Sequence, residues 1–69
     1  MAGLNLDSIF TYHAPKGDQQ ERYVAIRTKA KELAELIQGA CPASREASVA
    51  LTNVQQAVMW ANASIAINE

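Results

Sequence analysis

The chain has 69 residues and a net charge of −1, and 49% of its residues are hydrophobic but only 6% aromatic. A chain of this length forms one domain and buries only about 60% of the surface that its unfolded state exposes. Its charge argues against a protein that coats duplex nucleic acid, because such binding neutralises many phosphates. No apolar run reaches the length of about 18 residues that a membrane span needs.

Cysteine and histidine occur once each, as Cys41 and His13. An intrachain disulfide and a four-ligand zinc site built from Cys and His are therefore excluded, and we expect no metal and no cofactor. The single thiol, together with an N-terminus that lacks the regions of a signal peptide, predicts a cytoplasmic protein. Small domains without such cross-links usually gain stability by association, so we expect an oligomer.

The first predicted segment, 1–17, is a short helical turn followed by a loop. Asp7 is suited to cap a single turn. Pro15 disfavours helix at the preceding residue, and Gly17 adds a second break.

The second predicted segment is a helix over 18–40. Asp18 and Glu21 have the spacing of a capping box. Gly39 is suited to stop the helix, and Pro42 supports the break. An apolar stripe at helical spacing follows the cap and consists of Tyr23, Ile26, Ala30, Leu33 and Ile37.

The third predicted segment is a helix over 42–67, with Pro42 in its first turn or Ser44 as the alternative cap. Its apolar stripe consists of Ala47, Leu51, Val54, Val58, Ala61 and Ile65. The short turn before it predicts an all-α fold, an antiparallel two-helix hairpin with a short N-terminal helical turn.

The third segment also carries apolar residues on a second side, namely Val49, Trp60, Ala63 and Ile67. A hairpin has one internal seam, so a second apolar side needs another partner, which we expect to be a further copy of the chain. The alternative is that Trp60 packs against the N-terminal segment of its own chain, and the two arrangements are compatible.

Catalysis has little support in the sequence. A nucleophilic pair of Cys41 and His13 would require two distant positions to meet. Glu32 and Glu35 are neighbours on the second segment, where an ordinary pair of Lys31 with Glu35 favours solvated charges. We therefore expect a protein that is not an enzyme and has no catalytic residues.

Ligand binding has better support. Tyr12 and His13 lie in a loop ahead of a helix, where a ring can stack on a nucleobase. Arg27 and Lys29 lie at the two borders of the apolar stripe, where they can bury their stems and still offer charge to an anion. An aromatic plane with flanking cations is what a nucleotide needs.

Five ordered blocks resemble the hairpin domain of phage sponge proteins, a domain shared by anti-CBASS and Thoeris anti-defence sponges. They are FTYHAP at 10–15, ERYVAIR at 21–27, AKELA at 30–34, CPASRE at 41–46 and AVMWANASIA at 57–66.

The resemblance implies a hairpin that assembles into dimers and then hexamers. It also implies that cyclic di- or trinucleotides are sequestered in the host bacterial cytoplasm without cleavage, so that CBASS effectors are not activated. A Thoeris-type sponge for cyclic ADP-ribose-derived signals is the alternative ligand class, and a structural hairpin without a ligand is the alternative of another kind. No nucleic-acid polymer and no membrane are expected as partners.

The resemblance also implies roles for single residues. Tyr12 corresponds to the loop tyrosine that stacks on bases, and Arg27 corresponds to the basic residue that meets the phosphates. The polar residue that assists is Thr28 or Lys29. His13 belongs to the expected ligand-binding residues because of its place beside Tyr12 in the loop, and not because of the resemblance. Ile67 stands where relatives often carry arginine, which puts a separate cyclic-trinucleotide site in doubt.

Overall fold

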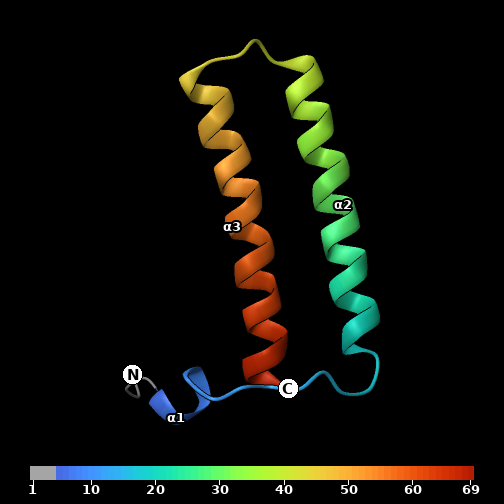
Figure 1. Cartoon of the computed structure of the whole chain (residues 1–69), viewed down its shortest axis with the longest axis vertical. Helices are drawn as coiled ribbons and strands as arrows, with labels where there is room; N and C mark the ends of the chain where they lie inside the picture. Colours follow the sequence, from blue (N-terminus) through green and yellow to red (C-terminus); the bar gives the residue numbers. More distant parts are fainter. Residues whose placement is uncertain (1–4) are drawn as a thin grey trace.

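The computed structural model describes residues 5–69, so the first four residues of the predicted 1–17 segment lie outside it. Its elements are α1 (Leu6–Ile9), α2 (Gln19–Ala40) and α3 (Arg45–Asn68). The two long helices lie side by side and antiparallel, and residues 5–18, which we call the arm, cross the open end of this hairpin (Figure 1). The expectation of an all-helical hairpin is confirmed over the described residues.

The start of α2 differs from the predicted capping box. Asp18 is the N-cap, but its side chain makes no capping hydrogen bond. Its backbone has φ of −90° and ψ of 10° instead of the extended geometry of a capping residue, and its carboxylate accepts from Nε of Arg22 at 3.2 Å. The residue before it, Gly17, has φ of +58°, in the left-handed region that favours glycine, and turns the arm into the helix.

The turn between the long helices also differs from expectation in two details. Gly39 does not stop α2, which continues to Ala40 and ends where Cys41 becomes extended. The third segment begins at Arg45 instead of Pro42, and the alternative cap is confirmed, because the Oγ of Ser44 accepts from the Ala47 amide at 3.1 Å.

The short helix α1 is capped by Asn5 instead of the predicted Asp7. The Oδ1 atom of Asn5 accepts from the Ser8 amide at 3.1 Å, as an N-cap side chain does. Asp7 lies one residue inside the helix, where its negative charge suits the first turn.

The apolar stripes of α2 and α3 meet in a single seam, as predicted, but the seam is shallow. Leu33 is 47% exposed, and no apolar side chain of residues 5–69 is fully buried. The accessible surface is 5659 Å², whereas a compact monomer of this size exposes about 4,200 Å². The radius of gyration is 15.1 Å, whereas about 11 Å is expected for this length.

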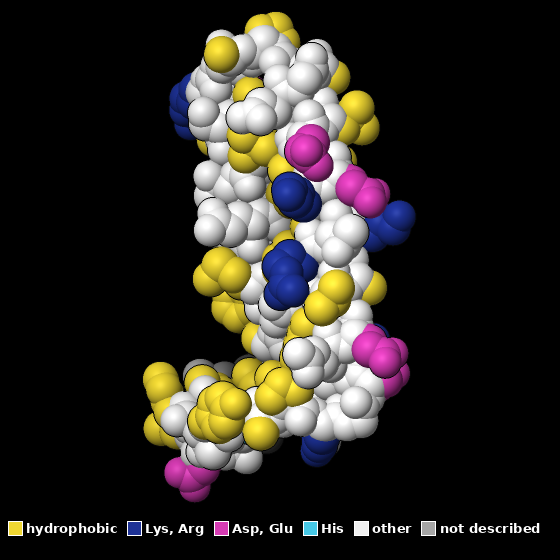
Figure 2. Space-filling view, turned by 45° about the vertical axis from the view of Figure 1, so that its right-hand side comes forward, with side chains coloured by type: hydrophobic (Ala, Val, Ile, Leu, Met, Phe, Trp, Pro, Cys, Tyr) yellow, Lys and Arg dark blue, Asp and Glu magenta, His cyan; other side chains and the backbone are white. Residues whose placement is uncertain are grey.

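Large apolar side chains remain exposed on the arm and along both helices (Figure 2). Trp60 is 74% exposed, so its ring is not buried against residues 5–18 of its own chain, and residues 1–4 of the N-terminal segment lie outside the described part. Within the described residues, no helix is both long enough and apolar enough to cross a membrane.

Candidate ligand-binding site

The loop that carries Tyr12 and His13 is held by bonds within the arm. The Nε2 atom of His13 donates to the backbone carbonyl of Ser8 at 2.6 Å, and the Thr11 hydroxyl donates to the carbonyl of Asp7. Tyr12 lies between these two anchors and is 83% exposed, with no hydrogen bond to any described residue. The loop therefore presents a free aromatic ring, while His13 is engaged in holding the loop.

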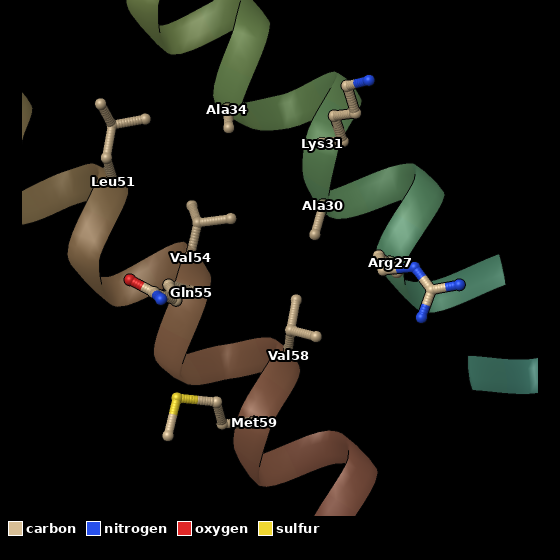
Figure 3. A pocket seen from close by; sticks show the side chains of 9 residues that line it. All are labelled: Arg27, Ala30, Lys31, Ala34, Leu51, Val54, Gln55, Val58 and Met59. Carbon is tan, nitrogen blue, oxygen red and sulfur yellow. The ribbon is translucent and has the colours of Figure 1, made fainter. Parts of the chain in front are cut away.

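Arg27 lies at the edge of a groove of 410 Å³ between α2 and α3. Lys31 and Gln55 are the other polar residues of this groove, and Figure 3 shows the charged ends of Arg27 and Lys31 pointing away from α3. The predicted pair of Lys31 with Glu35 does not form among the described residues. Two cations without an ion-pair partner in residues 5–69 therefore stand side by side along one groove, and sequence reasoning had missed Lys31.

Lys29 lines a different groove, of 490 Å³, whose other residues are apolar except for Asn53. Because successive helix residues are about 100° apart, Arg27 and Lys29 fall on opposite sides of Ala30, which the two grooves share. Lys29 also forms an ion pair with Glu32, with Nζ 3.5 Å from Oε2. The two predicted cations are therefore not brought together within one chain.

Thr28 is exposed and lines neither of these grooves. A smaller cleft of 360 Å³ is lined by Arg27 together with Tyr23, Asn62, Ala63 and Ala66. The Oδ1 atom of Asn62 is buried and has no hydrogen-bond partner among the described residues. Tyr23 and Asn62 were not predicted as site residues, although the resemblance includes both.

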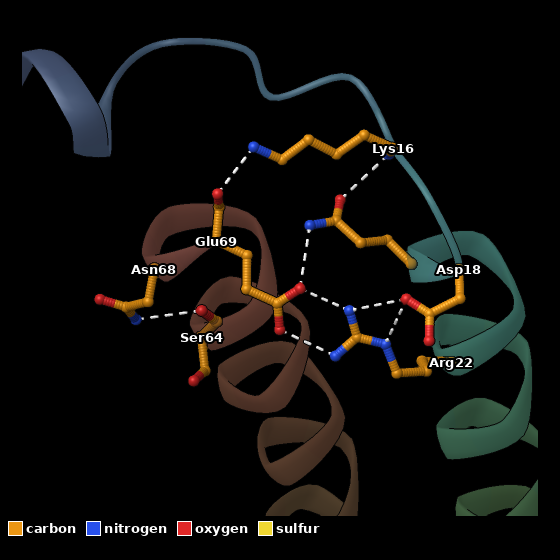
Figure 4. Close-up of polar contacts among 7 residues, drawn as sticks. Lys16, Asp18, Arg22, Ser64, Asn68 and Glu69 are labelled. Atoms are coloured by element: carbon orange, nitrogen blue, oxygen red, sulfur yellow. Dashed lines mark hydrogen bonds and ion pairs between the residues drawn. The ribbon is translucent and has the colours of Figure 1, made fainter.

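A polar network closes the open end of the hairpin, which we call the base (Figure 4). Glu69, directly after α3, accepts from Arg22 of α2 through both carboxylate oxygens, one of them at 2.8 Å from Nη1. Its backbone oxygen accepts from Nζ of Lys16 at 2.7 Å, and its Oε1 accepts from Nε2 of Gln19 at 3.3 Å. The base thus joins the arm to both long helices.

The network shifts the pKa values of Glu69 and Arg22. The hydrogen bond from Arg22, followed by the one from Gln19, lowers the pKa of Glu69 to about 2. The same carboxylate raises the pKa of Arg22 above its ordinary value. Both groups are therefore charged across the physiological range, which keeps the network intact there.

Cys41 lies exposed at the turn, at the end of the hairpin opposite the arm that carries His13 (Figure 1). These two residues do not meet, so the arrangement that a Cys–His nucleophile needs is absent from the described part of the chain. No group of three or more His, Cys, Asp or Glu side chains gathers in residues 5–69 as a metal site would require.

Comparison with known proteins gives one family. No curated protein and no solved structure matches the chain significantly. The family described as the Acb2/Tad1 hairpin domain matches residues 4–66, which is nearly the whole chain. The chain therefore belongs to the Acb2/Tad1 hairpin-domain family of anti-CBASS and anti-Thoeris sponges, and this membership implies a phage sponge for immune signals.

Proposed function

We propose that this protein binds cyclic dinucleotides and sequesters them without cleavage, so that CBASS effectors are not activated. The observation that carries the proposal is the Tyr12 ring, which is 83% exposed on a loop fixed from within the arm. A ring held in this way stacks on a nucleobase without first being ordered, which lowers the entropy cost of binding.

Arg27 supplies the phosphate contact in this proposal, and Lys31 adds a second positive charge along the same groove. A guanidinium makes strong charge-assisted hydrogen bonds to phosphate oxygens. Tyr12 lies on the arm at the base and is not among the residues that line the Arg27 groove. We infer that the complete site combines the arm of one copy with the groove of another.

We propose that the chain forms dimers that assemble into a hexamer. The accessible surface of 5659 Å² exceeds that of a compact monomer by about 1,400 Å². A standard interface covers about 800 Å² on each partner, so this excess equals one standard contact and most of a second. Exposed apolar residues suited to such contacts are Leu33, Leu36, Met59, Trp60 and Ile67; the number six rests on the family resemblance.

Sequestration without cleavage remains part of the proposal. Capture needs affinity alone, and neither Tyr12 nor Arg27 is an activated nucleophile or a general base. We expect the bound nucleotide to be recovered intact after the protein is denatured by heat. Chromatography that finds a linearised or hydrolysed product would favour an enzyme.

The ligand class is tested by thermal shift with cyclic di-AMP, cyclic di-GMP, a cyclic trinucleotide and a cyclic ADP-ribose isomer. A ligand that binds only the native state raises the unfolding temperature by mass action. Stabilisation by the dinucleotides supports the proposal, and stabilisation by cyclic ADP-ribose alone would assign the protein to the Thoeris-type ligand class. No shift with any of the four would favour a structural hairpin.

The site is tested by calorimetric titration of Tyr12→Ala and Arg27→Ala. We expect the first to lose about 1–3 kcal/mol per stacked base and the second about 1.5–3 kcal/mol per phosphate contact. Parallel titrations of Thr28→Ala and Lys29→Ala decide which of these residues assists. Arg45→Ala is the matched control, because it removes an exposed cation at the far end of the hairpin. Wild-type affinity in folded Tyr12→Ala and Arg27→Ala variants would overturn the site assignment.

A further inference from the structure

Gln19 is the one buried side chain in residues 5–69, with 3% of its surface exposed. A buried amide is costly unless its polar atoms are hydrogen-bonded. Both ends of this amide are satisfied, because Oε1 accepts from the Lys16 amide at 3.2 Å and Nε2 donates to Oε1 of Glu69 at 3.3 Å. Since no apolar residue of 5–69 is buried, the most enclosed position in this part of the chain is a polar connection.

These bonds join three separate parts of the chain. Lys16 belongs to the arm, Gln19 begins α2, and Glu69 follows α3. Arg22 holds the same Glu69 carboxylate from α2, and Lys16 holds the Glu69 backbone oxygen at 2.7 Å. The arm is therefore fastened to the ends of both long helices at a point four residues after Tyr12.

The second fastening lies just beyond Tyr12, where His13 is bonded to Ser8. Between these fastenings the backbone forms no helix, and directly before His13 the Tyr12 ring is exposed. If the bond at Gln19 were lost, the arm would still be held internally by His13 but would be less firmly attached to the hairpin. The ring would then sample more orientations, and binding would have to restore one of them.

We propose that Gln19 is a positioning residue, which sets the orientation of the Tyr12 ring for the ligand although it touches no ligand itself. This inference rests on the proposed function, since it requires that Tyr12 contacts a cyclic dinucleotide. The proposal rests on the position of Gln19, whose side chain joins the arm, α2 and Glu69 through its two hydrogen bonds.

The test compares Gln19→Leu, which keeps the size of the side chain and removes both hydrogen bonds, with the control Gln20→Leu at the exposed neighbouring position. The ligand is whichever of cyclic di-AMP and cyclic di-GMP binds the wild type more tightly. We expect Gln19→Leu to weaken binding about 3- to 10-fold, the cost of ordering a side chain and its loop, and Gln20→Leu to bind like the wild type.

A double-mutant cycle separates positioning from general destabilisation. In a Tyr12→Ala background, Gln19→Leu is expected to cause no further loss, because the ring that it positions is gone. An equal loss in both backgrounds, or wild-type affinity of Gln19→Leu, would overturn the positioning role. Binding of neither dinucleotide by the wild type would instead overturn the proposed function.

Amide hydrogen exchange of the ligand-free protein provides a second measurement. We expect faster exchange over residues 11–17 in Gln19→Leu than in the wild type or Gln20→Leu, with unchanged protection in the middle of α2 and α3. Unchanged exchange over 11–17 would overturn the anchoring. If Gln19→Leu does not fold, Glu69→Gln replaces it in both measurements, since it weakens the partner that Gln19 and Arg22 share.

Discussion

The base and the long sides of the hairpin are stabilised in opposite ways. At the base, charged and polar side chains from the arm, α2 and Glu69 satisfy one another, and Gln19 is enclosed among them. Along the sides, Leu36 and Trp60 are 66% and 74% exposed and contact little of their own chain. The base is complete within one chain, whereas the sides are not.

This difference separates the contacts that a single chain makes by itself from the contacts that we expect between copies in an oligomer. Polar contacts at the base fix where the arm leaves the hairpin, so each copy carries its own positioned Tyr12. In the proposed assembly, other copies cover the apolar side chains along the sides, because exposed hydrophobic surface of this extent favours association. In the proposed function, ligand capture depends on both regions: the base orients the Tyr12 ring, and the sides bring the groove of another copy next to it.

The largest effect is expected from Trp60→Ala, which removes an aromatic anchor from the incomplete sides. Truncation of such an anchor costs about 2–4 kcal/mol of association free energy. Sedimentation velocity at micromolar concentration is expected to show smaller species than the wild type.

Thr52→Ala, at an exposed position of the same helix, is the control and is expected to keep the wild-type mass. If Trp60→Ala sediments like Thr52→Ala, association of the chain does not depend on Trp60, and the proposed difference between the base and the sides is wrong.

An intermediate effect is expected at the turn, which belongs to neither region. Ser44→Ala removes the cap of α3 and is expected to cost about 1 kcal/mol, which lowers the unfolding temperature by about 4–8 °C. Ser48→Ala serves as the control, because no hydrogen bond of its side chain is present in the described residues. Equal shifts in the two variants would mean that the cap does not stabilise α3.

The smallest effect is expected from acidification, which acts on the base alone. The pKa of Glu69 is about 2 in the folded chain, below its ordinary value of 4.5. The contribution of its carboxylate is therefore fully present above pH 4.5 and is lost as the pH falls towards 2. Because Glu69 and Arg22 are exposed, solvent and salt screen the contribution.

Hydrogen exchange over residues 11–17 measures this effect. Protection is expected to be constant from pH 7 to about 5 and to fall below pH 4.5, after correction for the intrinsic exchange rate. Glu69→Gln is expected to abolish that dependence. The same decline in Glu69→Gln would assign the titration to another group.

The helices were predictable because their signals are local. The apolar stripe placed the second segment at 18–40, within one residue of α2. Cap chemistry was harder to predict, since several side chains compete for one role. Asp18 binds Arg22 instead of the helix amides, and Ser44 rather than Pro42 determines where α3 begins.

The site was predictable only in part because it depends on contacts between distant residues. The sequence suggested that Arg27 and Lys29 flank one surface, yet each lines its own groove once α3 packs against α2. Gln19 carries no sequence signal, because its partner Glu69 is 50 residues away. The exposure of Tyr12 follows from the arm crossing the base, which no local pattern encodes.

The dihedral of Gly17 makes the angle between the arm and α2 sensitive to a single substitution. Apart from Gly17 and its two neighbours, no atom of the described residues lies within 4 Å of the position that a Cβ would occupy there, so a substitution meets only the strain of φ at +58°. Relief of that strain, about 1–2 kcal/mol for an L-residue, would swing the arm to a new angle without altering the chemistry of the ring or of the cations. A single substitution at Gly17 can thus change the angle of the arm while every side chain of the arm and of the grooves is kept.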